Sequence, residues 1–291
     1  MRTSTSANAD PTPENRRPAT GVPLPAAAVS LETAGVPLPA VGVPLETAGG
    51  SRRTAGVPLP AGPSTVVERW ARRWSWALPA WAVLLGVSTL THQPDPADDF
   101  GSYAAYVTTA SFRLSHLVAS ITGAGIGIVG ATALTILLGR TAGARRALRW
   151  LPVVVLGQAL TISVFGAAAF AQPAIGRVHR EGAAIVAQRV DELVYSGPLF
   201  ATAIVGLLAL IAGSVGLGRA VGDSGVAPTW AVRAFVAGSI VFPLAGLPGL
   251  VLQPIAGFVL AGASTAIVVP LRRMSAAGER TTGREETSPE R

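Results

Sequence analysis

The sequence predicts an all-α fold: a polytopic integral membrane helix bundle with six transmembrane helices and a disordered N-terminal tail. Two features of the 291 residues carry this prediction. Only 13% of the residues are charged and 49% are hydrophobic, whereas a soluble domain carries roughly 25% charged residues. Every one of the 23 basic residues is an arginine, and many of these stand in clusters at the ends of long uncharged runs.

Residues 1–65 form the predicted tail, in which the tetrapeptide GVPL recurs. Proline in each copy excludes a coiled coil, because proline removes a helical N–H and clashes with the preceding turn. The segment is rich in Pro, Gly and Ala and almost lacks aromatic side chains, so it buries too little apolar surface to offset the entropy of ordering. We therefore expect a disordered cytoplasmic tail; a Pro-rich ligand for a partner domain is the alternative.

The first four transmembrane helices follow from uncharged runs at 74–94, 114–139, 150–176 and 193–218. A helix needs roughly 20 apolar residues to cross the hydrocarbon core, so each run holds one span. Helices satisfy the backbone within a single segment, as lipid requires. The predicted spans lie near 74–91, 115–138, 151–171 and 198–217.

The last uncharged run, 234–271, is too long for one span. As a single helix it would measure about 57 Å, against a hydrocarbon core of about 30 Å. Pro248 and Gly249 are strong turn formers in its middle. We therefore predict two spans, near 232–248 and 252–270, which completes a six-span domain over 66–274 and leaves a second disordered cytoplasmic tail at 275–291.

Arginine clusters predict the orientation of these six spans. Arg69 to Arg73 precede the first span, Arg140 to Arg149 separate the second from the third, and Arg272 and Arg273 follow the sixth. Arginines crowd cytoplasmic loops. Six spans place all these clusters on one side, whereas five would strand the last pair outside. The sequence thus predicts a multi-pass protein of a bacterial plasma (inner) membrane with cytoplasmic N- and C-termini.

Two loops then face outward, at 92–113 and 173–198. In the second loop, apolar residues recur at roughly helical spacing, which predicts a short amphipathic helix on the membrane surface or capping the bundle. These residues are Ile175, Val178, Ile185, Val186 and Leu193.

A stripe of small residues runs along the second predicted span. Ala119, Gly123, Gly127 and Ala131 are each four apart, so they share one helix face. Such a face lets a neighbouring backbone approach closely. We expect it to pack against another helix of the same chain; homodimerisation is the alternative.

Apart from Arg233, at the start of the fifth predicted span, no Asp, Glu, Lys or Arg lies inside any predicted span. Pumps, proton-coupled transporters and voltage sensors use such groups, so these classes are disfavoured. Gln158 is the most conspicuous polar residue within a span, and we expect it to bond helices together; lining a substrate path is the alternative. Pro243 and Pro248 are compatible with a broken transporter helix or with a simple kink.

All three histidines, His92, His116 and His179, fall near the predicted outer face. Asp95, Asp98 and Asp99 lie between the first two, and imidazoles with carboxylates are groups that bind Zn²⁺ or Cu²⁺; His92, His116 and Asp95 are the candidate ligands. No H-E-x-x-H or comparable spacing surrounds them, so we predict no metal site and no cofactor. The absence of lysine excludes a P-loop, and no G-x-S-x-G marks a nucleophile, so we predict no catalytic residue.

These observations favour a non-enzymatic subunit or accessory protein of the membrane, with lipids and a membrane protein as partners and no nucleic acid. The first alternative is a small-molecule transporter or channel. The second is a metal- or lipid-processing enzyme that acts at the outer face.

Overall fold

The computed structural model describes residues 66–91, 93–246 and 252–285, with side chains up to residue 276. All regular structure in these ranges is helical, which confirms the predicted all-α fold. The predicted tail at 1–65, His92, and the turn at Pro248 and Gly249 lie outside the described residues. The helices are α1 (Val66–Trp74), α2 (Ala77–Ser88), α3 (Phe100–Val107), α4 (Ala110–Leu114), the π-helix η1 (Ser115–Thr122), α5 (Gly123–Leu138), α6 (Ala144–Arg180), α7 (Ala184–Tyr195), α8 (Gly197–Ser224), α9 (Thr229–Ala245) and α10 (Leu252–Glu285).

Four helical segments are long and apolar enough to cross a membrane. They are Ala110–Leu138, Ala144–Arg180, Gly197–Ser224 and Leu252–Ala276. Helix α9 is apolar but shorter, with 17 residues, and α2 has 12. The uncharged run at 234–271 is divided between α9 and α10, because the first ends at Ala245 and the second begins at Leu252.

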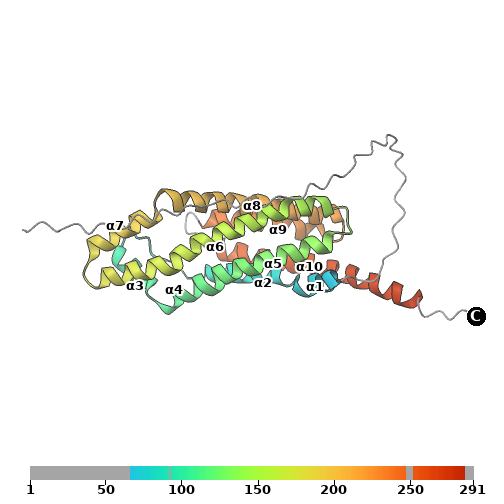
Figure 1. Cartoon of the computed structure of the whole chain (residues 1–291), viewed down its shortest axis with the longest axis horizontal. Coiled ribbons are helices and arrows are strands. Elements are labelled where there is room, and N and C mark those ends of the chain that lie inside the picture. Colours follow the sequence, from blue (N-terminus) through green and yellow to red (C-terminus); the bar gives the residue numbers. More distant parts are fainter. Residues whose placement is uncertain (1–65, 92, 247–251, 286–291) are drawn as a thin grey trace, which may run out of the picture. The chain divides into compact units, whose positions relative to one another are not determined.

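Six helices pack as a closed ring, here called the helix ring: α2, α5, α6, α8, α9 and α10. Each packs against the next in chain order, and α10 returns to pack against α2. Figure 1 shows α2, α5 and α10 running alongside one another, with α6, α8 and α9 beside them. The ring therefore brings α2, near the start of the described chain, into contact with α10 at its end.

Glycines set the spacing between the ring helices. A Cβ at Gly130 of α5 would lie 2.5 Å from the backbone nitrogen of Leu78, and one at Gly157 of α6 would lie 2.5 Å from that of Leu210. Between α10 and α2, a Cβ at Gly257 would approach the backbone of α2 to 2.6 Å. Backbones can approach this closely only where no side chain intervenes, as is usual for membrane helices.

Helices α6 and α10 extend beyond the spans that were predicted within them. Helix α6 extends beyond the predicted 151–171 because arginines at both ends are good helix formers whose charges reach out of the bundle. It stops where Gly182 adopts φ 96° and Ala183 N–H donates to the Val178 carbonyl. Helix α10 continues to Glu285 rather than ending before a disordered tail at 275–291, because Ala, Arg, Met and Glu favour helix there.

The two predicted outer loops also contain more helix than expected. The first holds α3 and α4, whose N-caps are side chains of Asp99 and Thr109 accepting from Ser102 N–H and Phe112 N–H. In the second, Ile175 and Val178 belong to α6, so the predicted amphipathic helix is shorter and is α7 alone. Short capped helices of this kind carry a weaker pattern than the spans do.

Candidate functional site

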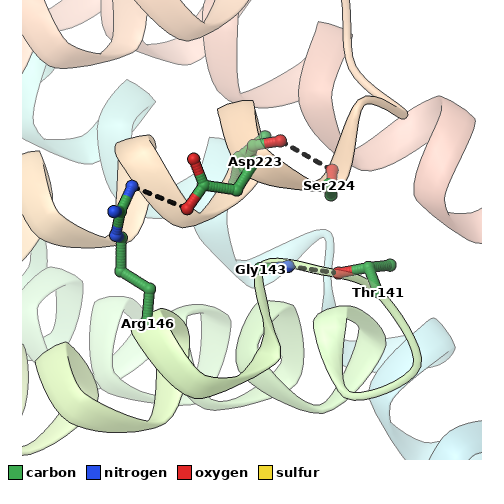
Figure 2. A network of polar contacts seen from close by, with 6 residues as sticks. Thr141, Gly143, Arg146, Asp223 and Ser224 are labelled. Atoms are coloured by element: carbon green, nitrogen blue, oxygen red, sulfur yellow. Dashed lines mark hydrogen bonds and ion pairs between the residues drawn. The ribbon is translucent and has the colours of Figure 1, made fainter. Parts of the chain in front are cut away.

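Contacts made by three arginines join four distant segments at one end of the helix ring, here called the arginine end. Arg140 pairs with Glu68 of α1 at 2.7 Å, and Arg146 of α6 pairs with Asp223 of α8 at 2.6 Å (Figure 2). The guanidinium of Arg72 donates to the carbonyl of Ser275 of α10 at 3.1 Å. These contacts place α1, the α5–α6 loop and the ends of α8 and α10 together.

The Arg146–Asp223 pair lies where the α5–α6 loop packs against the end of α8, a contact here called the Arg146–Asp223 corner. Thr141 Oγ1 accepts from Gly143 N–H at 3.2 Å in the loop below it (Figure 2). A Cβ at Gly143 would lie only 2.0 Å from the Ala220 carbonyl oxygen, so the loop presses directly on α8. Both charged side chains are about half exposed, at 45% and 40%, and such pairs contribute about 1 kcal/mol or less. Close packing, more than the ion pair, holds this corner.

At the opposite end of the 37-residue α6, three helices form a polar cap. It comprises α3, α7 and the last turns of α6, and its polar residues are Tyr103, Gln172, His179, Asp191 and Tyr195. Tyr103, 1% exposed, donates its hydroxyl hydrogen to Asp191 Oδ1 at 3.0 Å and so ties α3 to α7. Helix α3 approaches closely because Gly176 of α6 has no side chain: a Cβ there would lie 2.7 Å from the Ala104 carbonyl oxygen.

Burial governs the ionisation of the polar cap. It raises the pKa of Asp191, and the hydrogen bond from Tyr103 opposes this only in part. Burial, with the negative charge of Asp191 beside them, also raises the pKa of Tyr103 and of Tyr195, so both phenols stay neutral. The exposed Asp99 is different, because hydrogen bonds from Ser102 lower its pKa.

Three buried polar atoms of the cap have no hydrogen-bond partner within the described part of the chain. They are Gln172 Oε1, His179 Nδ1 and Tyr195 Oη. The His179 ring instead packs against Phe100, with centroids 5.1 Å apart. Buried polar atoms usually have a protein or water partner, so water or a small polar ligand fits this cap better than an apolar one does.

A second buried polar group lies inside the helix ring. Gln158 is 2% exposed, and its Nε2 and Trp81 Cδ1 would each lie 2.9 Å from a Cβ at Gly127. The indole nitrogen of Trp81 is buried without a hydrogen-bond partner among the described residues. Helices α2, α5 and α6 thus converge on these three residues.

The small-residue stripe of η1 and α5 packs against another helix of the same chain. Ala119 and Ala131 are 4% and 2% exposed. A Cβ at Gly123 would meet Leu84 of α2 at 3.3 Å, so the stripe faces α2. The sequence analysis missed Gly130, one position off the stripe, where α2 and α5 come closest.

The metal candidates do not assemble into a site in the described ranges, where no group of three or more His, Asp or Glu residues could hold an ion. His116 stacks on Phe112, with centroids 4.1 Å apart, and its Nδ1 lies 3.1 Å from the Phe112 carbonyl oxygen. Asp95 accepts from Ala97 N–H within its own turn. His92 lies outside the described residues.

Comparison of the chain with protein-family models, with curated proteins and with solved structures finds no match. The polar cap was also missed by the sequence analysis. Tyr103 and Asp191 are 88 residues apart, and nothing in either local pattern signals the other. Only the capping pattern Asp99-x-x-Ser102 hinted that the first outer loop is ordered.

Proposed function

We propose that the chain crosses a bacterial plasma membrane six times, with both termini in the cytoplasm. The gathering of Arg72, Arg140 and Arg146 at one end of the helix ring carries this proposal, because positive residues concentrate on the cytoplasmic side. Six crossings require α2 and α9 to span. Helix α9 measures about 26 Å, close to the 30 Å of the core. Helix α2 alone measures about 18 Å, so a crossing at α2 uses the whole uncharged run 74–94 around it, and the charged α1 stays at the arginine end.

Reporter fusions test this topology. A reporter enzyme active only outside the cytoplasm should be inactive after Arg291 and active when inserted at Gly182, between α6 and α7. Activity after Arg291 would refute the six-span proposal, because an odd number of crossings would then place the C-terminus outside.

Within that topology, we propose a non-enzymatic subunit or accessory protein that binds a membrane protein partner through α7. The outward face of this helix supports the proposal: Ile185 is 84% exposed, Val186 56% and Leu193 64%. The inward face is fixed by the Tyr103–Asp191 hydrogen bond, so the apolar residues are held in a defined position. Rigidly presented apolar side chains at a membrane surface are typical of a binding surface.

Photo-crosslinking in native membranes tests the role of α7. A photoreactive residue at Ile185 or Leu193 should give one discrete protein adduct. The control position is Leu208 of α8, which is 59% exposed but lies within a membrane-length helix; it should give lipid adducts only. Lipid adducts alone at Ile185 and Leu193 would refute a partner at α7.

A transporter or channel is the second candidate, supported by the buried Trp81 Nε1 and Ser264 Oγ, which have no hydrogen-bond partner among the described residues, and by the position of Trp81 beside Gln158. Because the chain has no cysteine, Gln158→Cys supplies a single reactive thiol. Labelling of that thiol by a water-soluble maleimide from one side of the membrane would support an aqueous path. An unreactive thiol that reacts after denaturation would support packing alone.

A further inference from the structure

A groove on the surface of α10 lies apart from the polar cap and from Gln158. It has a volume of about 630 Å³ and is lined by residues 225–228 of the α8–α9 loop and by one face of α10. Gly262, Ala266, Val269 and Arg273 lie on that face, at spacings of four, three and four residues. We call it the lateral groove. Its volume lies within the roughly 300–1,000 Å³ of sites that hold small molecules.

The lateral groove is mostly apolar, with Thr265 among its lining residues, and it is basic at one end. From Gly262 to Arg273 it extends about 16 Å along the helix, parallel to the expected direction of lipid chains. Gly262 forms an open part of it, because a Cβ there would meet nothing within 4 Å. Pro270 has no N–H, so the Ala266 carbonyl lacks its usual helical donor.

Arg273 differs from its neighbour Arg272 in a way that points to a ligand. Arg272 lies 5.4 Å above the Trp76 ring and donates to Ser75 Oγ at 3.4 Å, so contacts with other residues hold it. Arg273 is exposed, lines the groove, and has no hydrogen bond or ion pair with the described residues. An unpaired guanidinium at the end of an apolar groove is complementary to an anionic head group.

We propose that the lateral groove binds one anionic phospholipid of the cytoplasmic leaflet, with an acyl chain beside Gly262 and Ala266 and the phosphate on Arg273. This rests on the proposed topology, which puts the arginine end at the leaflet that carries anionic lipid. Basic pockets between helices on that side bind such head groups. The α8–α9 loop closes the groove at the same end, beside the Arg146–Asp223 corner.

Native mass spectrometry of the full chain tests this binding. The protein is released from nanodiscs containing equal amounts of phosphatidylglycerol and phosphatidylcholine, and bound lipids are identified by mass. Wild type should retain one phospholipid, with phosphatidylglycerol preferred. Arg273→Gln should lower that preference about fivefold, the effect of one arginine near a charged lipid surface. Arg272→Gln removes the same charge one residue away and should retain the preference.

Gly262→Leu provides the second variant, because it fills the groove without a clash and should abolish retention of both lipids. Gly166→Leu is its control, since Gly166 of α6 is also open, with nothing within 4 Å of an added Cβ, but lies outside the groove. Three results would each overturn the proposal. They are an equal loss of the phosphatidylglycerol preference in Arg272→Gln and Arg273→Gln, retention of phospholipid by Gly262→Leu, and a wild-type protein that is a dimer without bound lipid. Because the readout is bound mass, it is independent of the reporter fusions that test topology.

Discussion

Replacing Gly130 by alanine should separate α2 from α5. The added Cβ would lie 2.5 Å from Leu78 N and 2.7 Å from Leu78 Cα, whereas ordinary contacts begin at 3.4 Å. Because the obstacle is backbone, no rotamer change relieves it, and α2 must move by about 0.9 Å (from 2.5 to 3.4 Å). Helix α2 also packs on α10, so the movement disturbs a second interface.

Gly125→Ala, in the same helix, is the matched control for this effect. A Cβ at Gly125 meets nothing within 4 Å. Both variants gain roughly 1 kcal/mol of helix propensity, which cancels when they are compared. The remaining difference is the cost of overpacking, about 1–3 kcal/mol, so Gly130→Ala should lower the free energy of unfolding by that amount relative to Gly125→Ala.

Denaturant titration of the protein in mixed micelles, followed by circular dichroism, measures both free energies of unfolding if the transition is reversible. Two variants that agree within about 0.5 kcal/mol, well below the expected overpacking cost, would refute the reasoning. The α2–α5 contact would then be looser than the structure has it.

Three further predictions concern other parts of the chain. Gly143→Ala should destabilise the protein more than Arg146→Ala does. The Cβ added at residue 143 would meet the Ala220 carbonyl oxygen at 2.0 Å, whereas Arg146→Ala removes a half-exposed ion pair worth about 1 kcal/mol or less. Thermal denaturation in detergent compares the two variants, and a lower thermal midpoint for Arg146→Ala would contradict the prediction. Because burial raises the pKa of Asp191 above its ordinary 3.8, the stability contributed by its protonated form is fully present below 3.8 and is lost as pH rises through the higher folded pKa. The thermal midpoint of wild type should therefore fall more between about pH 3.5 and pH 7 than that of Asp191→Asn, and parallel curves would count against a buried carboxyl. Deleting residues 2–62 should leave membrane accumulation unchanged, since that sequence is predicted to bury almost nothing; loss of accumulation on immunoblots of membrane fractions would assign the segment a role in folding.

Helix positions were predictable wherever charge and apolarity change sharply along the chain. The uncharged run before Arg140 located α5, and Pro248 with Gly249 indicated that 234–271 holds two helices. Helix ends were harder to predict, because arginine is both a sign of the membrane boundary and a good helix former. Helix α6 therefore continues to Arg180, although the apolar run ends at Gly176.

Candidate sites were less predictable than spans, because they depend on contacts between distant segments. The stripe through Gly127 was visible as a pattern within one helix. Its partners Trp81 and Gln158 come from two other helices, and no local periodicity pairs them. Likewise, Arg272 and Arg273 are equivalent in sequence, and only their surroundings show that one is held by Trp76 and the other lines the lateral groove.

Contact between α2 and α10 has a consequence for biosynthesis. Residues 88 and 252 are separated by 164 positions, so at 5–20 residues per second the ribosome needs roughly 10–30 seconds to deliver the covering helix. During that time the face of α2 around Gly86, against which Gly257 finally rests, stays uncovered by α10. A nascent chain that stops before α10 would therefore leave that face of α2 without its partner helix.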